Sequence, residues 1–111
     1  VDDDEKDLKS MKEVLEEGRY GALIAANGAE ALDKLDAGDV DLVLIDIQMP
    51  TLSGYDLLRL ARQKVNHNVK MIFVTVLPEK DVSMDDVDGY VQKPFNSESL
   101  LEKVKSVLGD G

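Results

Sequence analysis

Residues 41–46 read DLVLID, with four consecutive apolar residues between two aspartates. Because no polar residue interrupts the run at alternate positions, a strand formed here would be apolar on both faces. Strands that are buried on both faces are typical of parallel sheets, which are covered by helices on each side. The stretch KMIFVTV (70–76) has the same character. The two runs therefore predict two strands of a parallel sheet.

Apolar residues elsewhere in the chain recur at helical spacing, separated by Gly, Asn and Pro positions that favour breaks. Helices are predicted around residues 8–15, 31–35, 57–65 and 100–108, and two shorter apolar stretches, YGALIAAN (20–27) and GYVQ (89–92), are predicted to be strands. Alternating strands and helices indicate an α/β fold with a mainly parallel sheet and right-handed crossovers.

Size and charge narrow the class of protein. A chain of 111 residues, 43% of them hydrophobic, predicts one domain with one real core. The formal net charge of −10 repels phosphate backbones, so we expect no direct binding of nucleic acid. No apolar run is long enough to span a bilayer, so we expect no membrane contact. The absence of cysteine fits a reducing compartment, and the expected location is the cytoplasm.

Polar residues occur where the predicted strands end, and in parallel α/β sheets ligands bind beyond these carboxyl ends. The residues at these positions are Asp2 and Asp3, which follow Val1, then Asp46, Thr75 and Lys93. If the fold prediction is right, three carboxylates, one hydroxyl and one ammonium group meet at one edge of the sheet.

This set of groups suits phosphoryl transfer to a carboxylate. Clustered carboxylates repel one another, and Mg²⁺, which prefers oxygen ligands and often shares its shell with a phosphate, relieves that repulsion. A carboxylate can attack a phosphoryl group and form an acyl phosphate. The metal and a lysine would neutralise charge on the phosphoryl oxygens, and the hydroxyl could donate a hydrogen bond to them. The set therefore predicts a phosphoryl-accepting aspartate with Mg²⁺ as cofactor.

Four motifs follow one another in order: VDDD (1–4), LVLIDIQMPTLSGYDLL (42–58), IFVTV (72–76) and GYVQKPF (89–95). Together they resemble the receiver domain of two-component response regulators, over nearly the whole chain. The resemblance implies a flavodoxin-like fold, a three-layer, doubly wound parallel sheet of five strands in the order 2-1-3-4-5. It also implies that residues 1–111 form a single receiver domain.

The resemblance further implies the roles of the acidic residues. Asp46 would be the phosphoacceptor and would also belong to the metal site. Asp3 would be the direct Mg²⁺ ligand of the acidic pair, and Asp2 would orient a metal-bound water. The backbone carbonyl of Gln48 would complete the protein ligands.

The remaining roles concern the phosphoryl group and the response to it. The resemblance implies that Thr75 hydrogen-bonds the phosphoryl group, that Lys93 pairs with one of its oxygens, and that the bond from Lys93 to Pro94 is cis. Tyr90 matches the family's aromatic switch. A histidine kinase or phosphotransfer protein would supply the phosphoryl group, and a downstream protein or output domain would receive the signal. The chain is expected to be a switch in phosphorelay signalling and not an enzyme.

Two conspicuous residues receive structural interpretations. Asp4 follows the acidic pair, but an acid in the first turn of a helix is favoured by the helix dipole, so no metal role is expected. His67 lies in the polar stretch VNHNV with no acid beside it, and we interpret it as a solvated loop residue.

Three features depart from the family's pattern. Val76 stands where a small residue is usual, and we expect it to narrow access to the phosphoryl group. The stretch from Thr75 to Lys93 is about one helical turn shorter than usual. Its helix is expected to be short or irregular, which leaves the signalling face and the oligomeric state open. The first strand is nearly absent; we expect residues upstream of Val1 to supply it, in preference to another segment or chain.

Two other functions remain as alternatives. A degenerate receiver would act as a non-phosphorylated interaction module, which Val76 and the shortened stretch leave possible. An aspartate-nucleophile phosphatase similar to the haloacid dehalogenase family is the weaker alternative. That family needs a second Asp two residues after the nucleophile, and Gln48 occupies this position.

Overall fold

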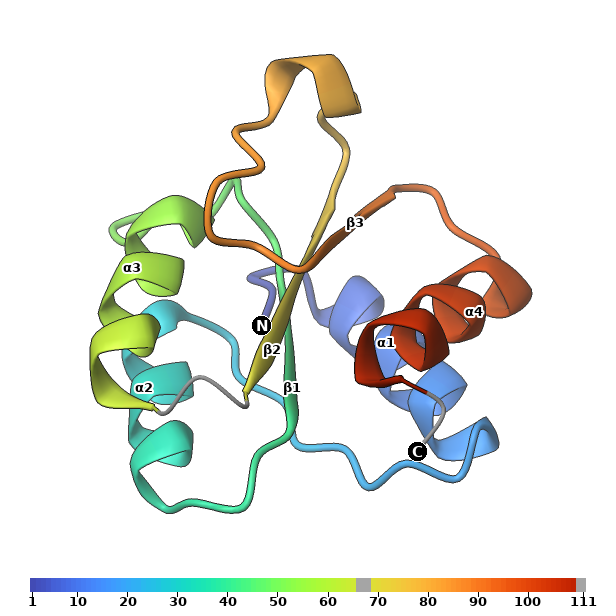
Figure 1. Cartoon of the computed structure of the whole chain (residues 1–111), viewed down its shortest axis with the longest axis horizontal. Helices are drawn as coiled ribbons and strands as arrows, with labels where there is room; N and C mark the ends of the chain where they lie inside the picture. Colours follow the sequence, from blue (N-terminus) through green and yellow to red (C-terminus); the bar gives the residue numbers. More distant parts are fainter. Residues whose placement is uncertain (66–68, 110–111) are drawn as a thin grey trace.

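Three parallel strands run through the centre of the molecule, with helices on both sides (Figure 1). The computed structural model describes residues 1–65 and 69–109, so His67 lies outside the described residues. The elements, in chain order, are α1 (Glu5–Glu17), α2 (Gly28–Asp36), β1 (Leu42–Ile45), α3 (Gly54–Lys64), β2 (Lys70–Thr75), the 3-10 helix η1 (Glu79–Asp81), β3 (Gly89–Gln92) and α4 (Ser97–Leu108). Within those ranges no helix combines the length and the apolar character that crossing a membrane requires.

The two apolar runs form neighbouring strands, as predicted. β1 pairs with β2 and β2 with β3, all parallel, with Ile45 opposite Phe73 and Phe73 opposite Tyr90. Five of the six residues of β2 are buried, including all of its apolar residues, because helices cover both faces of the sheet.

The helices form two outer layers. Figure 1 shows α2 and α3 on one side of the sheet and α1 and α4 on the other. Alternate strand residues serve the two sides: Ile45 and Phe73 pack in the core beneath α2 and α3, whereas Leu44 and Ile72 pack in the core beneath α1 and α4. The predicted three-layer α/β architecture is therefore confirmed.

Each α-helix begins at a capping side chain. Asp4, Asn27, Ser53 and Asn96 each accept a hydrogen bond from a backbone N–H in the first turn of the helix that follows. Asp4 thus starts α1, accepting from the N–H groups of Lys6 and Asp7, which confirms its interpretation as a helix-start acid.

The prediction of a strand at residues 20–27 is wrong. This segment has no regular structure, and Leu23 and Ile24 expose 74% and 40% of their surface. A strand needs a hydrogen-bonding neighbour along its length, and only Val1 and Asp2 lie between this segment and β1. The Val1 nitrogen donates to Leu44, the Asp46 N–H donates to Val1, and the Asp2 N–H donates to Ala25. The described sheet therefore holds three strands, which correspond to the last three of the expected order.

The segment between β2 and β3 is irregular, as the shortened spacing predicts. Its one regular element is η1, a single turn of three residues. The Tyr55 hydroxyl accepts a hydrogen bond from the Ser83 N–H at 3.0 Å, and Val82 packs into the core beneath α2 and α3. The segment is thus held against α3 although it forms no α-helix.

Candidate functional site

Asp46 directly follows β1 and lies at the carboxyl end of the sheet. It exposes only 7% of its surface, and its Oδ1 accepts the Gln48 N–H at 3.4 Å. The N-terminus of α3 packs against the backbone here, since the Gly54 N–H donates to the Ile47 carbonyl at 2.9 Å. A Cβ atom on Gly54 would lie 2.5 Å from the Asp46 carbonyl oxygen. The absence of a side chain at Gly54 therefore allows α3 to approach the strand end.

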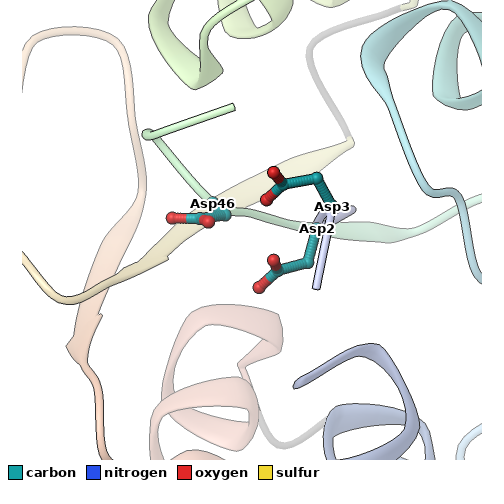
Figure 2. A group of neighbouring side chains, drawn as sticks. All are labelled: Asp2, Asp3 and Asp46. Carbon is teal, nitrogen blue, oxygen red and sulfur yellow. The ribbon is translucent and has the colours of Figure 1, made fainter. Parts of the chain in front are cut away.

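Asp2 and Asp3 lie beside Asp46 because the backbone of Val1 is hydrogen-bonded to Leu44 of β1 and to Asp46. Each of the three aspartates offers a carboxylate oxygen within 4.8 Å of the others. Figure 2 shows their carboxyl groups facing the same side of the view. Asp2 is fully buried, whereas Asp3 is exposed. A hard divalent cation fits such a set, because carboxylate oxygens are its preferred ligands and its charge offsets their repulsion.

The charge of Asp46 is unfavourable in the absence of a cation. Burial raises the pKa of Asp46, the negative charge of Asp2 raises it further, and Lys93 opposes both effects. A cation bound to these carboxylates would therefore reduce the unfavourable effect of burial and of their mutual repulsion.

Lys93 reaches the same site from the end of β3. Its N–H donates to the Thr75 carbonyl at 2.7 Å, and its peptide bond to Pro94 is cis, as expected. The Nζ atom lies 2.5 Å from Asp2 Oδ2 and 3.5 Å from Asp46 Oδ2. Burial disfavours the ammonium group, but hydrogen bonds to Asp2 and Asp7 outweigh burial and raise the pKa of Lys93.

Thr75 and Tyr90 are joined through Leu77. Thr75 is fully buried at the end of β2, and its Oγ1 accepts the Leu77 N–H at 3.3 Å. The hydroxyl of half-buried Tyr90 donates to the Leu77 carbonyl. Val76 lies between Thr75 and Leu77 in the chain and exposes 56% of its surface.

Sequence reasoning missed one member of this cluster, Asp7. Its Oδ2 lies 2.8 Å from Lys93 Nζ, across 86 positions of the chain. Asp7 lies in the first turn of α1, which begins just after the acidic pair, so its place in the sequence put it near the site. The sequence alone could not show that Lys93 would be brought to Asp7.

A doubly wound α/β fold with clustered carboxylates and a lysine at the carboxyl end of its sheet defines a class of flavodoxin-like domains. Comparison with known proteins identifies the family. Residues 1–105 match the family described as the response regulator receiver domain. The chain therefore belongs to the response regulator receiver domains, which are signalling modules of two-component systems.

Relatives with curated descriptions agree with this assignment. The chain is 34% identical over 115 residues to the transcriptional regulatory protein CpxR of Escherichia coli, an alignment covering 97% of this chain and 47% of CpxR. It is 30% identical over 116 residues to the polar-differentiation response regulator DivK of Brucella anthropi, covering 99% and 94%. The chain thus spans about half the length of CpxR but nearly all of DivK.

Solved structures agree on the fold. The response regulator TrrA of Thermotoga maritima, in complex with Mg²⁺ and BeF, has a TM-score of 0.87 and 40% identity, covering 97% of this chain and 95% of TrrA. The chemotaxis protein CheY4 of Vibrio cholerae has a TM-score of 0.89 and 28% identity, covering 97% and 94%. The predicted flavodoxin-like fold is confirmed.

Proposed function

We propose that the chain is a phosphorylatable switch domain. A histidine kinase or phosphotransfer protein supplies a phosphoryl group to Asp46 in a Mg²⁺-dependent reaction, and the altered domain signals to a downstream protein or output domain. The observation that carries this proposal is the buried Asp46 with Asp2 and Asp3 within 4.8 Å and Lys93 at 3.5 Å. We further propose that residues 1–111 act as one domain, in the cytoplasm, as a switch and not as an enzyme.

The acidic residues fit the proposed cation. Asp3, Asp46 and the Gln48 carbonyl would hold Mg²⁺, and Asp2 would orient a water bound to it. When bound, the ion neutralises charge on the phosphoryl oxygens and on the attacking carboxylate. The Gln48 N–H lies 3.4 Å from Asp46 Oδ1, so the Gln48 main chain stands beside the acceptor.

The transfer step uses groups that this chain supplies. An Asp46 carboxylate oxygen forms the new bond to phosphorus, and the bond between phosphorus and the donor's leaving group breaks with its electron pair staying on the donor. Lys93 balances the negative charge that gathers on the phosphoryl oxygens, and its position is set by the backbone bond to Thr75.

The response would start at Thr75. Its hydroxyl can accept the Leu77 N–H and still donate its own proton to a phosphoryl oxygen. Any movement of Thr75 toward the phosphoryl group would pull on Leu77, to which the Tyr90 hydroxyl is bonded. This connection supports Tyr90 as the element that reports phosphorylation to the surface, by a shift between two populations.

Small phosphoryl donors and mimics provide the test. In the presence of Mg²⁺, acetyl phosphate should add one phosphoryl group to the parent chain, and beryllofluoride should shift amide resonances around Asp46 and Thr75. Asp46→Asn should do neither. Asp33→Asn is the control. This substitution removes the same charge from an exposed position on α2, away from the site.

The same experiment separates the alternatives. If neither reagent perturbs the parent, and Asp46→Asn behaves like it, the non-phosphorylated interaction module is favoured. Release of phosphate from small phosphoesters at enzyme-like turnover would favour the phosphatase.

A further inference from the structure

Lys93 is held by an acid that belongs to neither the metal site nor the phosphoacceptor. Its Nζ lies 2.8 Å from Asp7 Oδ2 and 2.5 Å from Asp2 Oδ2, whereas Asp46 Oδ2 is farther away, at 3.5 Å. Two of the three ammonium protons can thus form hydrogen bonds to Asp2 and Asp7, whereas Asp46 forms only a longer ion pair with Lys93.

The position of Asp7 is set by the start of α1. The Asp4 side chain accepts the Asp7 N–H at 3.2 Å and the Lys6 N–H at 2.8 Å, which orders the first helical turn. The Lys93 side chain exposes only 9% of its surface, so few water molecules can replace a lost partner. Asp7 is a fixed acceptor presented to a nearly buried cation.

We propose that Asp7 is a positioning residue that competes with the phosphoryl group on Asp46 for the Lys93 ammonium. The inference rests on the proposed function and adds a control on how tightly the phosphorylated form is held. A phosphoryl group brings new acceptor oxygens to Asp46, and the Lys93 ammonium, now bonded to Asp2 and Asp7 and 3.5 Å from Asp46 Oδ2, must loosen one of those two bonds to move closer to them. Asp7 is that partner, because its side chain is 37% exposed and water can solvate it once released. Release of Asp2 would cost more, because its side chain is fully buried and water cannot replace the ammonium group there.

The competition predicts that removing the Asp7 charge tightens the binding of a phosphoryl mimic. Beryllofluoride is titrated into the whole chain at saturating Mg²⁺, and amide shifts report the dissociation constant. Asp7→Asn and Asp7→Ala should bind about two- to fivefold more tightly than the parent, as expected for a partly exposed ion pair. Asp7→Glu, which keeps the charge, should bind more nearly like the parent.

Two controls separate this role from a general effect of charge or stability. Glu5→Gln removes an exposed charge from the same helical turn and should leave the dissociation constant unchanged. Urea unfolding without ligand should show Asp7→Asn equal to or less stable than the parent, so that tighter binding cannot come from a more stable fold. In a Lys93→Gln background, Asp7→Asn should lose its effect on binding.

The outcomes are distinct. If the parent binds beryllofluoride and Asp7→Asn binds equally or more weakly, Asp7 is a structural ion-pair partner and the inference is overturned. The same holds if the tightening persists in the Lys93→Gln background. If the parent itself does not bind with Mg²⁺, the proposed function fails and the inference fails with it.

Discussion

At the scale of single residues, the site gathers an excess of negative charge. Carboxylate oxygens of Asp2, Asp7 and Asp46 lie within 3.5 Å of the Lys93 ammonium group, and Asp3 lies beside Asp2 and Asp46, so negative charge exceeds positive charge before any cation binds. Groups held in this way are individually unfavourable, and they are tolerated where a ligand uses them. This cost should appear as a lower free energy of unfolding of the metal-free protein.

The charge of Asp46 should destabilise the metal-free fold. Burial and the charge of Asp2 raise the pKa of Asp46, so any stability from this group is present below its unfolded pKa and is lost as pH rises through the raised value. Asp46→Asn should therefore be more stable than the parent at neutral pH without Mg²⁺, and the difference should shrink below pH about 4. Urea unfolding at both pH values tests this, and a parent equal or superior in stability at neutral pH would contradict it.

Val76 should slow reaction at Asp46. Its β-branched side chain directly follows Thr75, where the family usually has a small residue, and it is 56% exposed, so truncation leaves no internal cavity. We expect Val76→Ala to be phosphorylated by acetyl phosphate, or to lose the phosphoryl group, faster than the parent. Exposed Met84→Ala serves as the control. Equal rates for the parent and Val76→Ala would remove the proposed role in access.

At the scale of elements, the site depends on how closely α3 approaches the end of β1. The contact is backbone against backbone: Gly54, the first residue of α3, meets the carbonyl of Asp46 and the Cα of Ile47. Neither of these atoms can rotate away as the end of a side chain can.

A methyl group at Gly54 should separate the two elements. The Cβ of alanine would lie 2.5 Å from the Asp46 carbonyl oxygen and 2.6 Å from the Ile47 Cα. We expect Gly54→Ala to lower the free energy of unfolding by about 1 to 3 kcal/mol, the usual cost of overpacking, and to weaken Mg²⁺ binding.

The matched control for this substitution is Gly21→Ala, since a Cβ at Gly21 meets no atom within 4 Å. Urea unfolding and Mg²⁺ titration of both variants provide the measurement. Equal stability of Gly54→Ala and the parent would show that α3 can move away without cost.

At the scale of the whole molecule, the two sides of β1 differ in how well they are packed. Beyond β1 the sheet is formed by paired strands covered on both faces, whereas on the other side of β1 lies a cavity of about 580 Å³. It is lined by Val1, Leu8, Met11, residues 20–25 and the outer side of β1. An open cavity beside β1, the edge strand of the described sheet, implies that this side of the domain is the less stable one.

Hydrogen exchange should reveal this asymmetry. Within the part of the chain that the structure describes, no backbone N–H of residues 21–25 donates to a backbone carbonyl, whereas β2 is paired on both sides. Amides of residues 21–25 should exchange faster than those of β2 by about two orders of magnitude or more, because opening β2 requires disruption of the core. Similar protection of the two segments would show that residues 20–27 form a strand in solution.

Most of the fold could be predicted because its signals are local. Each segment's pattern of apolar residues shows which of its faces must be buried, whatever its neighbours are. This holds for the apolar runs at 42–45 and 70–75 and for the apolar stripes of the helices. The strand predicted at 20–27 failed because strand formation depends on a partner: the same residues have strand character but lie beside a cavity. The irregular segment before β3 was predictable from its length alone.

For the site, the sequence by itself determined which groups are available, Asp2, Asp3, Asp46, Thr75 and Lys93, and that the last three stand at strand ends. The ends of parallel strands must meet at one edge, so their proximity followed from topology. Only the tertiary structure decided how the charges pair, that Asp7 on α1 holds Lys93 and that Leu77 joins Thr75 to Tyr90. These contacts depend on distances of a few ångströms between side chains from different elements, and no spacing along the chain encodes them.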